Sequence, residues 1–162
     1  MLLAPIVDLE NCTFELISEL RLPLVNRFYA SCNYRVKCGR FERVYSLSFS
    51  GKIIAAARLI LQRSGHYLLR NLCVEPGLRN QGIASYLLRA VLASLGNLNC
   101  YCYALPHLQN FYLSLQFKHL APHQVPDDIS EMHMRHCSRK RGWILMGYIN
   151  SPDLNVDNQG YK

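Results

Sequence analysis

A change of hydrophobic period near the middle of the chain constrains the fold more than any other feature of the sequence. Apolar residues first come in extended runs, alternating over 43–49 and nearly continuous over 53–61 and 67–74, with turn residues between the runs. The period then becomes helical, and the apolar residues that share one face are Ile83, Leu87, Ala90, Val91 and Leu95. Three consecutive strands followed by an amphipathic helix predict a domain in which helices pack on a sheet.

Weaker patterns place further elements on both sides of this segment. A strand over Cys12–Ile17 and a helix over Leu22–Tyr29 come before it. The segments after it alternate, with a strand over Cys100–Ala104, a helix carrying Leu108, Phe111, Tyr112 and Leu115, extended structure over Phe117–Leu120, a helix over Asp127–Arg139 and a strand over Trp143–Ile149. The 162-residue chain is therefore predicted to form one α/β (α+β) domain over residues 1–150, followed by a polar, fraying tail over 151–162.

Composition restricts the class of protein and of partner. Half of the residues are hydrophobic and 18% are charged, which argues against intrinsic disorder. The formal net charge of +7 favours an anionic partner, which leaves nucleic acid, an acidic membrane surface and a phosphorylated cofactor as alternatives. Seven cysteines, an odd number without the spacing of a disulfide framework, indicate a reducing compartment. With no secretory leader and no apolar run of ~20 residues, the expected location is the cytoplasm, without a membrane partner.

The loop that joins the third strand to the helix is the candidate binding site. It spans residues 72–84 and places Gly82 and Ala84, both small, at the start of the helix. A helix N-terminus presents unpaired amides and a partial positive charge, and small residues let a phosphate approach them closely. Arg79 adds a formal charge beside these amides, so the loop is suited to an anion.

Residue spacing separates three kinds of phosphate-binding loop. Gly77 and Gly82 fit the first part of G-x-x-x-x-G-K-[ST], but Ile83 and Ala84 stand where that motif needs lysine and a hydroxyl residue, which excludes a nucleotide triphosphatase. The dinucleotide fingerprint G-x-G-x-x-G is also missing. The third pattern, [QR]-x-x-G-x-[GA], fits Arg79, Gly82 and Ala84.

On these residues the chain resembles the GNAT superfamily of acyl-CoA-dependent N-acetyltransferases. A second match lies about 30 residues further on, where the run from Phe111 to Phe117 resembles the family's F-Y-x-x-x-G-F segment. The resemblance implies a GNAT-like fold, with a mixed, mostly antiparallel central sheet flanked by helices. It also implies acetyl-CoA as co-substrate, no metal, and transfer of the acetyl group to a primary amine of a small molecule or peptide by direct attack in a ternary complex.

The resemblance also implies which residues bind acetyl-CoA. Amides of the loop would bind the pyrophosphate, and the third-strand edge, which the family separates from the next strand, would pair with the pantetheine arm and supply an oxyanion donor. The residues implied in binding are Leu72, Cys73, Val74, Arg79, Asn80, Gln81, Gly82, Ile83, Ala84 and Ser85.

Tyr112 is the residue implied in catalysis. It would donate a hydrogen bond, and shift a proton, to the departing thiolate. A tyrosine of pKa about 10 protonates a thiolate of pKa about 8.5 only at a cost of roughly 2 kcal/mol, so the residue must be held close to the sulfur.

Three positions depart from the family pattern. Many members have a glutamate on the strand that corresponds to 67–74, where it acts as the general base that deprotonates the acceptor amine. This chain has Arg70 and Asn71 there. Glu42 and His107 are then the candidate bases. Gln116 replaces the usual glycine of the second motif. Leu105 stands where many members have an asparagine that contacts the pantetheine arm.

The remaining residue clusters are better explained without a further site. Cys100 and Cys102 lack the C-x₂-C spacing of a zinc site, and His133, His136 and Cys137 lack a third well-placed ligand. An acyl-cysteine on Cys73 has no evident base beside it. The basic residues of the run near the predicted last helix, which suit its C-terminal end, are Arg135, Arg139, Lys140 and Arg141.

Two rival functions stay open beside the acetyltransferase. One is a non-catalytic CoA-binding or sensing domain of the same fold, which the missing strand glutamate favours. The other is a basic nucleic-acid-binding protein, against which the lack of aromatic residues within the basic run argues. The last strand, over Trp143–Ile149, has an apolar edge suited to pairing between subunits, so a homodimer is open beside a monomer.

Overall fold

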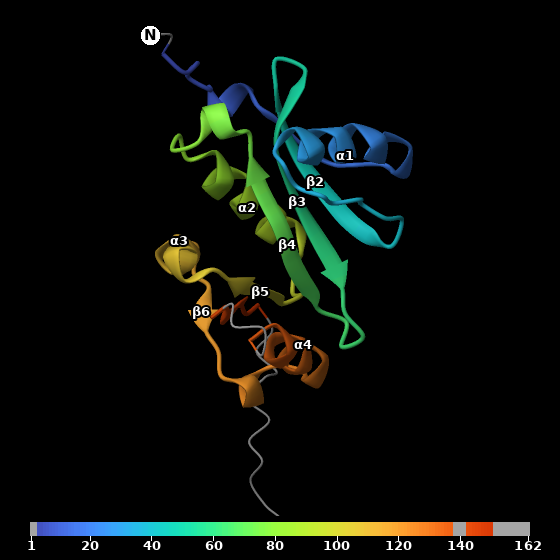
Figure 1. Cartoon of the computed structure of the whole chain (residues 1–162), viewed down its shortest axis with the longest axis vertical. Coiled ribbons are helices and arrows are strands. Elements are labelled where there is room, and N and C mark those ends of the chain that lie inside the picture. The colour runs from blue at the N-terminus through green and yellow to red at the C-terminus, as the bar shows by residue number, and fades with distance from the viewer. Residues whose placement is uncertain (1–2, 138–141, 151–162) are drawn as a thin grey trace, which may run out of the picture.

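The computed structural model describes residues 3–137 and 142–150, which contain one seven-stranded sheet and four α-helices (Figure 1). The strands are β1 (Thr13–Leu16), β2 (Glu42–Phe49), β3 (Lys52–Leu61), β4 (Tyr67–Val74), β5 (Cys100–Ala104), β6 (Lys118–His119) and β7 (Ile144–Tyr148). The helices are α1 (Leu22–Ser31), α2 (Ile83–Ser94), α3 (Gln109–Ser114) and α4 (Asp127–Cys137). The strand order β1-β2-β3-β4-β5-β7-β6 is antiparallel except between β4 and β5, which confirms the predicted mixed sheet.

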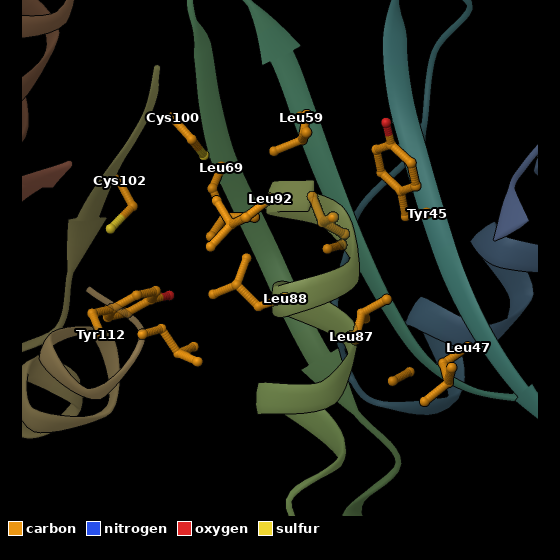
Figure 2. Packing of buried hydrophobic residues seen from close by; sticks show 14 of the residues in the cluster. Tyr45, Leu47, Leu59, Leu69, Leu87, Leu88, Leu92, Cys100, Cys102 and Tyr112 are labelled. Atoms are coloured by element: carbon orange, nitrogen blue, oxygen red, sulfur yellow. The ribbon is translucent and has the colours of Figure 1, made fainter. Parts of the chain in front are cut away.

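Each face of the sheet is covered by two helices. Alternate side chains of β2 and β3 divide into one cluster with α2 and another with α1, so these helices lie on opposite faces. The amphipathic face of α2 supplies the centre of the larger cluster, where Leu87, Leu88 and Leu92 point at the sheet and Tyr112 approaches from α3 (Figure 2). On the opposite face, α4 adds Ile129 to a smaller cluster with Leu68 of β4. The sheet is therefore buried on both sides.

The two parallel strands separate along their length. β4 and β5 pair only at Tyr67–Cys100 and Leu68–Tyr101, at the beginning of each strand. Beyond this point β5 runs away from β4 toward α3 (Figure 1). The later half of β4 keeps only β3 as a hydrogen-bonded neighbour, so its other edge is open.

A β-bulge lies in β4 beside this opening. Ala56 and Arg58 of β3 pair with Cys73 and Arg70, so β4 has one residue more than β3 between these pairs. Asn71 takes the bulged position with a left-handed φ of 53°. Its carbonyl accepts a hydrogen bond from the Tyr29 hydroxyl at 2.7 Å, which ties the bulge to α1.

The last strand does not have the open edge predicted for it. β7 lies between β5 and β6, because the extended segment after α3 returns to pair with Met146 and Gly147. The expectation of an outer edge on Trp143–Ile149 is thus wrong for these residues. The predicted tail, and the predicted last helix beyond Cys137, fall outside the described residues. None of the helices in the described part is long and apolar enough to span a membrane.

Candidate active site

A cavity of about 480 Å³ opens where β4 ends and α2 begins. One wall is the open edge of β4, another is the loop and first turn of α2, and the third is the segment that leads into α3. Nine of the ten residues predicted to bind acetyl-CoA line this cavity, namely Leu72, Cys73, Val74, Arg79, Asn80, Gly82, Ile83, Ala84 and Ser85. We refer to it as the first cavity.

Gln81 is the predicted binding residue that does not line this cavity. Its side-chain oxygen accepts a hydrogen bond from the Val7 amide at 2.9 Å, and its amide nitrogen donates to the Pro5 carbonyl at 3.0 Å. The side chain thus holds the N-terminal segment against the loop. It has structural contacts with this segment and does not line the cavity.

The loop before α2 presents amides to the first cavity. Asn80 and Gly82 both have left-handed φ values, 65° and 78°, which turn the chain sharply into the helix. The first bond of the helix runs from the Tyr86 amide to the Gly82 carbonyl. Within the described residues, the amides of Gly82, Ile83, Ala84 and Ser85 have no acceptor, as expected for the first turn of a helix. These amides are free to bind an anion.

Arg79 is positioned beside these amides by the end of β4. Its Nε donates to the Val74 carbonyl at 3.4 Å, and the side chain is exposed at the mouth of the cavity. Glu75, the residue after β4, is ion-paired with Lys52 at 2.7 Å. Its charge is therefore partly compensated near the anion-binding loop.

Cys73 is unsuited to act as a nucleophile. The side chain is buried against α1, and burial raises the pKa of its thiol to about 12. At neutral pH the thiol is therefore protonated, whereas the thiolate is the reactive form.

Tyr112 of α3 lies at the separation of β4 and β5, beside Cys102 (Figure 2). Its side chain is buried, and desolvation is the main reason that the pKa of its hydroxyl lies well above the usual value. The hydroxyl is thus kept protonated, as a proton donor requires.

The turn after α3 holds Tyr112 in place. The Phe117 amide donates to the Tyr112 carbonyl at 3.1 Å and the Gln116 amide to the Leu113 carbonyl at 3.1 Å, which is the Schellman arrangement. The Phe117 ring packs against the Tyr112 ring at 5.3 Å between centroids. Gln116 adopts the left-handed φ of 68° that this turn requires, so the turn is kept although the usual glycine is absent.

A second cavity of about 210 Å³ lies next to the first across the separation of the strands. Five residues line both cavities, namely Tyr34, Leu72, Leu105, Leu108 and Tyr112. Residues that line only the second include Arg70, Asn71, Tyr103 and Trp143. A ligand in one cavity can therefore meet a ligand in the other beside Tyr112.

Neither candidate base lies in the second cavity. Both Glu42 carboxylate oxygens accept from Arg58, at 3.0 and 2.6 Å, and one also accepts from the Gly39 amide at 2.8 Å. Glu42 lines neither cavity, so the structure does not support it as the base. His107 lines only the first cavity.

Tyr34 is a site residue that sequence reasoning missed. It follows α1 in a segment without hydrophobic periodicity, and its ring contacts Tyr29 at 6.1 Å. Nothing local distinguishes it from the nine other tyrosines. Only the packing of α1 on β4 brings it to the place where the cavities meet.

The described residues contain no cluster of His, Cys, Asp or Glu that could hold a metal ion. His133 Nε2 is 2.7 Å from the Trp143 carbonyl and 3.3 Å from Cys137 Sγ, so this histidine has a structural contact. Of the basic run, residues 139–141 lie outside the described part of the chain.

Comparisons with known proteins agree with this geometry. A family model described as an acetyltransferase (GNAT) domain matches residues 40–119, which include the loop and the α3 motif. No curated protein sequence matches the chain.

Three solved structures illustrate the shared fold. N-acetylglutamate synthase from Neisseria gonorrhoeae, complexed with coenzyme A and N-acetyl-glutamate, superposes with a TM-score of 0.63 at 12% identity, over 86% of this chain and 35% of its own. The Escherichia coli ribosomal-protein-S18-alanine N-acetyltransferase has a TM-score of 0.59 at 17% identity, over 93% and 99%. Arabidopsis thaliana Naa50, in complex with the bisubstrate analogue CoA-Ac-MVNAL, has a TM-score of 0.57 at 15% identity, over 85% and 98%.

A mixed sheet opened between β4 and β5, with an amide-lined loop at the opening, defines an acyltransferase-type fold. The chain belongs to the GNAT acetyltransferase family.

Proposed function

We propose that the protein transfers an acetyl group from acetyl-CoA to a primary amine by direct attack of the amine on the thioester. The observation that carries this proposal is the pair of adjoining cavities, one with free helix amides at its mouth, which meet at a buried tyrosine. Two structural neighbours described as complexes of coenzyme A or a CoA analogue support the same choice of co-substrate.

The loop of the first cavity is suited to the pyrophosphate. Amides from Arg79 through Ser85 and the Ser85 hydroxyl would donate to phosphate oxygens, and the positive end of α2 would add to the attraction. The left-handed φ of Gly82 directs these amides outward. Arg79 would contribute a charge at the surface, where solvent weakens it.

The open edge of β4 is suited to the pantetheine arm. Backbone groups of Leu72, Cys73 and Val74 on this edge lack a partner strand because β5 has moved away. They would pair with the amide groups of the arm as an added strand does. A β4 amide would then donate to the thioester oxygen and stabilise the negative charge that develops during attack.

Tyr112 would act on the sulfur. As the amine nitrogen bonds to the carbonyl carbon and the carbon–sulfur bond breaks, the sulfur gains the electron pair and the Tyr112 hydroxyl donates a hydrogen bond to it. The raised pKa of this hydroxyl makes full proton transfer more costly. The residue therefore stabilises the departing thiolate chiefly through that hydrogen bond. Over the whole reaction the attacking amine loses one proton and the CoA thiolate gains one, so the protons balance.

A non-catalytic CoA-binding role is the second candidate. The second cavity has no carboxylate or histidine among its lining residues within the described part of the chain, so it offers no conventional base for the amine. This observation is what favours a binding or sensing function of the same fold.

Release of free CoA thiol over a panel of amines distinguishes the two. The panel contains amino acids, polyamines, aminoglycosides and peptides, each with acetyl-CoA and either the native chain or Tyr112→Phe. We expect release that depends on the amine and falls in the variant. Binding of acetyl-CoA without release for any amine would instead support the sensing function.

A further inference from the structure

The second cavity is positively charged, which an ordinary amine acceptor does not explain. Arg70 is the one lining side chain with a formal charge at neutral pH among the described residues; the others are apolar, aromatic, amide or thiol groups. A protonated amine near this guanidinium would be repelled. The acceptor must therefore bring something that compensates the charge.

Arg70 forms no ion pair within the part of the chain that the structure describes. It pairs in register with Arg58 of β3, so the two guanidinium side chains leave the same face of the sheet. Arg58 is neutralised by Glu42 at 2.6 Å and also donates to the Asn71 side chain at 2.9 Å. Arg70 is partly buried and has no ion pair with any described residue. Of these two neighbouring arginines, Arg58 has a carboxylate partner, whereas Arg70 has none among the described residues and lines the second cavity.

The walls limit the size of the acceptor. Tyr103 and Trp143 stack at 6.4 Å between centroids with an interplanar angle of 21°, and the Tyr103 hydroxyl is held by the Ile129 carbonyl at 2.7 Å. The volume of about 210 Å³ is below the ~300–1,000 Å³ usual for drug-sized ligands. The space fits a small molecule rather than a large one.

We propose that the acceptor is a small amine carrying an anionic group, carboxylate or phosphate, within a few bonds of its amino group, and that Arg70 binds that group. The inference rests on the proposed acetyl transfer. A guanidinium binds either anion through two parallel hydrogen bonds, which orients the ligand as well as attracting it. With the anion on Arg70, the amino group is directed along the cavity toward Tyr112, where the two cavities meet.

Matched pairs of acceptors test the need for the anion. Amino acids are compared with their amides, and 2-aminoethyl phosphate with ethylamine, by CoA-thiol release at saturating acetyl-CoA. For the amino acid pairs, the phosphate pair or both, we expect the kcat/KM of the anionic member to be about 10- to 100-fold higher than that of its partner without the anion. The kind of pair that shows the difference identifies carboxylate or phosphate. Equal rates, or faster reaction of the members that lack the anionic group, would overturn the proposal.

Arg70→Gln tests whether this residue carries the preference. The variant should remove the advantage of the anionic member mainly by raising the acceptor KM, while the Kd of acetyl-CoA stays unchanged. Arg70→Lys should restore part of it, since it keeps the charge but loses the paired hydrogen bonds. Arg63→Gln, an equal loss of charge in the exposed β3–β4 turn, should keep the full preference. An unchanged preference in Arg70→Gln refutes the assignment.

A measurement of acceptor binding, made without relying on turnover, distinguishes failure of this inference from failure of the proposed function. If no amine is acetylated although acetyl-CoA binds, calorimetry with the CoA-loaded protein compares an amino acid with its amide. Selective binding of the amino acid that is lost in Arg70→Gln would still support the anion site. Equal binding of both, or of neither, would refute it.

Discussion

Tyr112 is the side chain on which the proposed chemistry depends most. Tyr112→Phe removes only the hydroxyl, because Phe117 and the turn hold the ring in place. We expect kcat to fall about 10- to 100-fold, with the Kd of acetyl-CoA unchanged, since a hydrogen bond to a charged atom contributes about 1.5–3 kcal/mol. Single-turnover kinetics and a binding titration measure the two quantities. Full turnover in the variant would remove Tyr112 from the mechanism.

The pH dependence of the native enzyme follows from the same burial. A raised pKa keeps the Tyr112 hydroxyl protonated at pH values where an exposed tyrosine ionises. We therefore expect no loss of kcat between ~pH 8 and ~pH 10 from this group, measured at saturating concentrations of both substrates. A falling limb near pH 10 that disappears in Tyr112→Phe would contradict the burial argument.

Glu42 and Arg58 form a structural ion pair, and this can be separated from a catalytic role. The side chains are only 8% and 15% exposed, so Glu42→Gln leaves a buried guanidinium without its counter-ion. We expect the free energy of unfolding to fall by ~3 kcal/mol in urea titrations, while the pH profile of kcat keeps its shape. Arg21→Gln, which breaks an exposed pair with Glu15, should cost less than ~1 kcal/mol. Loss of the ascending, acidic limb of the kcat profile in Glu42→Gln would restore Glu42 as the base, because a general base acts in its deprotonated form.

At the scale of elements, the turn that ends α3 contains a strained residue. Gln116 has a φ of 68°, a conformation that costs a non-glycine residue roughly 1–2 kcal/mol. Gln116→Gly should therefore raise the free energy of unfolding by about 0.5–1 kcal/mol, after subtracting the greater entropy of glycine in the unfolded chain. Ser114→Gly, at the last residue of α3, should have the opposite sign, because Ser114 has helical backbone angles that glycine adopts only at an entropic cost. Destabilisation by both glycines would argue against strain at Gln116.

The loop before α2 permits a similar comparison for binding. Gly82 has a φ of 78°, so Gly82→Val strains the turn that directs the helix amides into the first cavity. We expect the affinity for acetyl-CoA to fall at least about 10-fold by calorimetry. Gly77→Ala is the matched control, because its added Cβ meets nothing within 4 Å and its φ is ordinary. Equal affinity in both variants would mean that the loop does not form the pyrophosphate site.

Local hydrophobic periodicity predicted the helices and strands. Each element buries one or both of its faces against neighbouring elements, and this burial leaves a regular pattern of apolar residues in the sequence. The alternating run that became β2 and the helical face of α2 needed no tertiary information. The position of β7 between β5 and β6, in contrast, needed tertiary information. It depends on β6, a strand of only two residues, Lys118–His119, that has little sequence pattern of its own. The predicted edge on the last strand was wrong for that reason.

At the scale of the whole molecule, the site exists because two strands diverge. The motif residues of the first cavity were predictable from spacing, since the loop and helix start are local. The second cavity was not, because Arg70, Tyr103 and Trp143 come from three segments that only the sheet order brings together. The sequence therefore predicted the residues that line the first cavity better than those that line the second.

Whether acetyl-CoA binds in the first cavity can be measured by its stabilisation of the folded chain. A ligand that binds only the native state at 100 times its Kd adds about 2.7 kcal/mol, which raises the Tm of a domain of this size by roughly 5–10 °C. We expect such a shift with millimolar acetyl-CoA for the native chain and Gly77→Ala, and a much smaller one for Gly82→Val. An unchanged Tm of the native chain would contradict the claim that the first cavity binds acetyl-CoA.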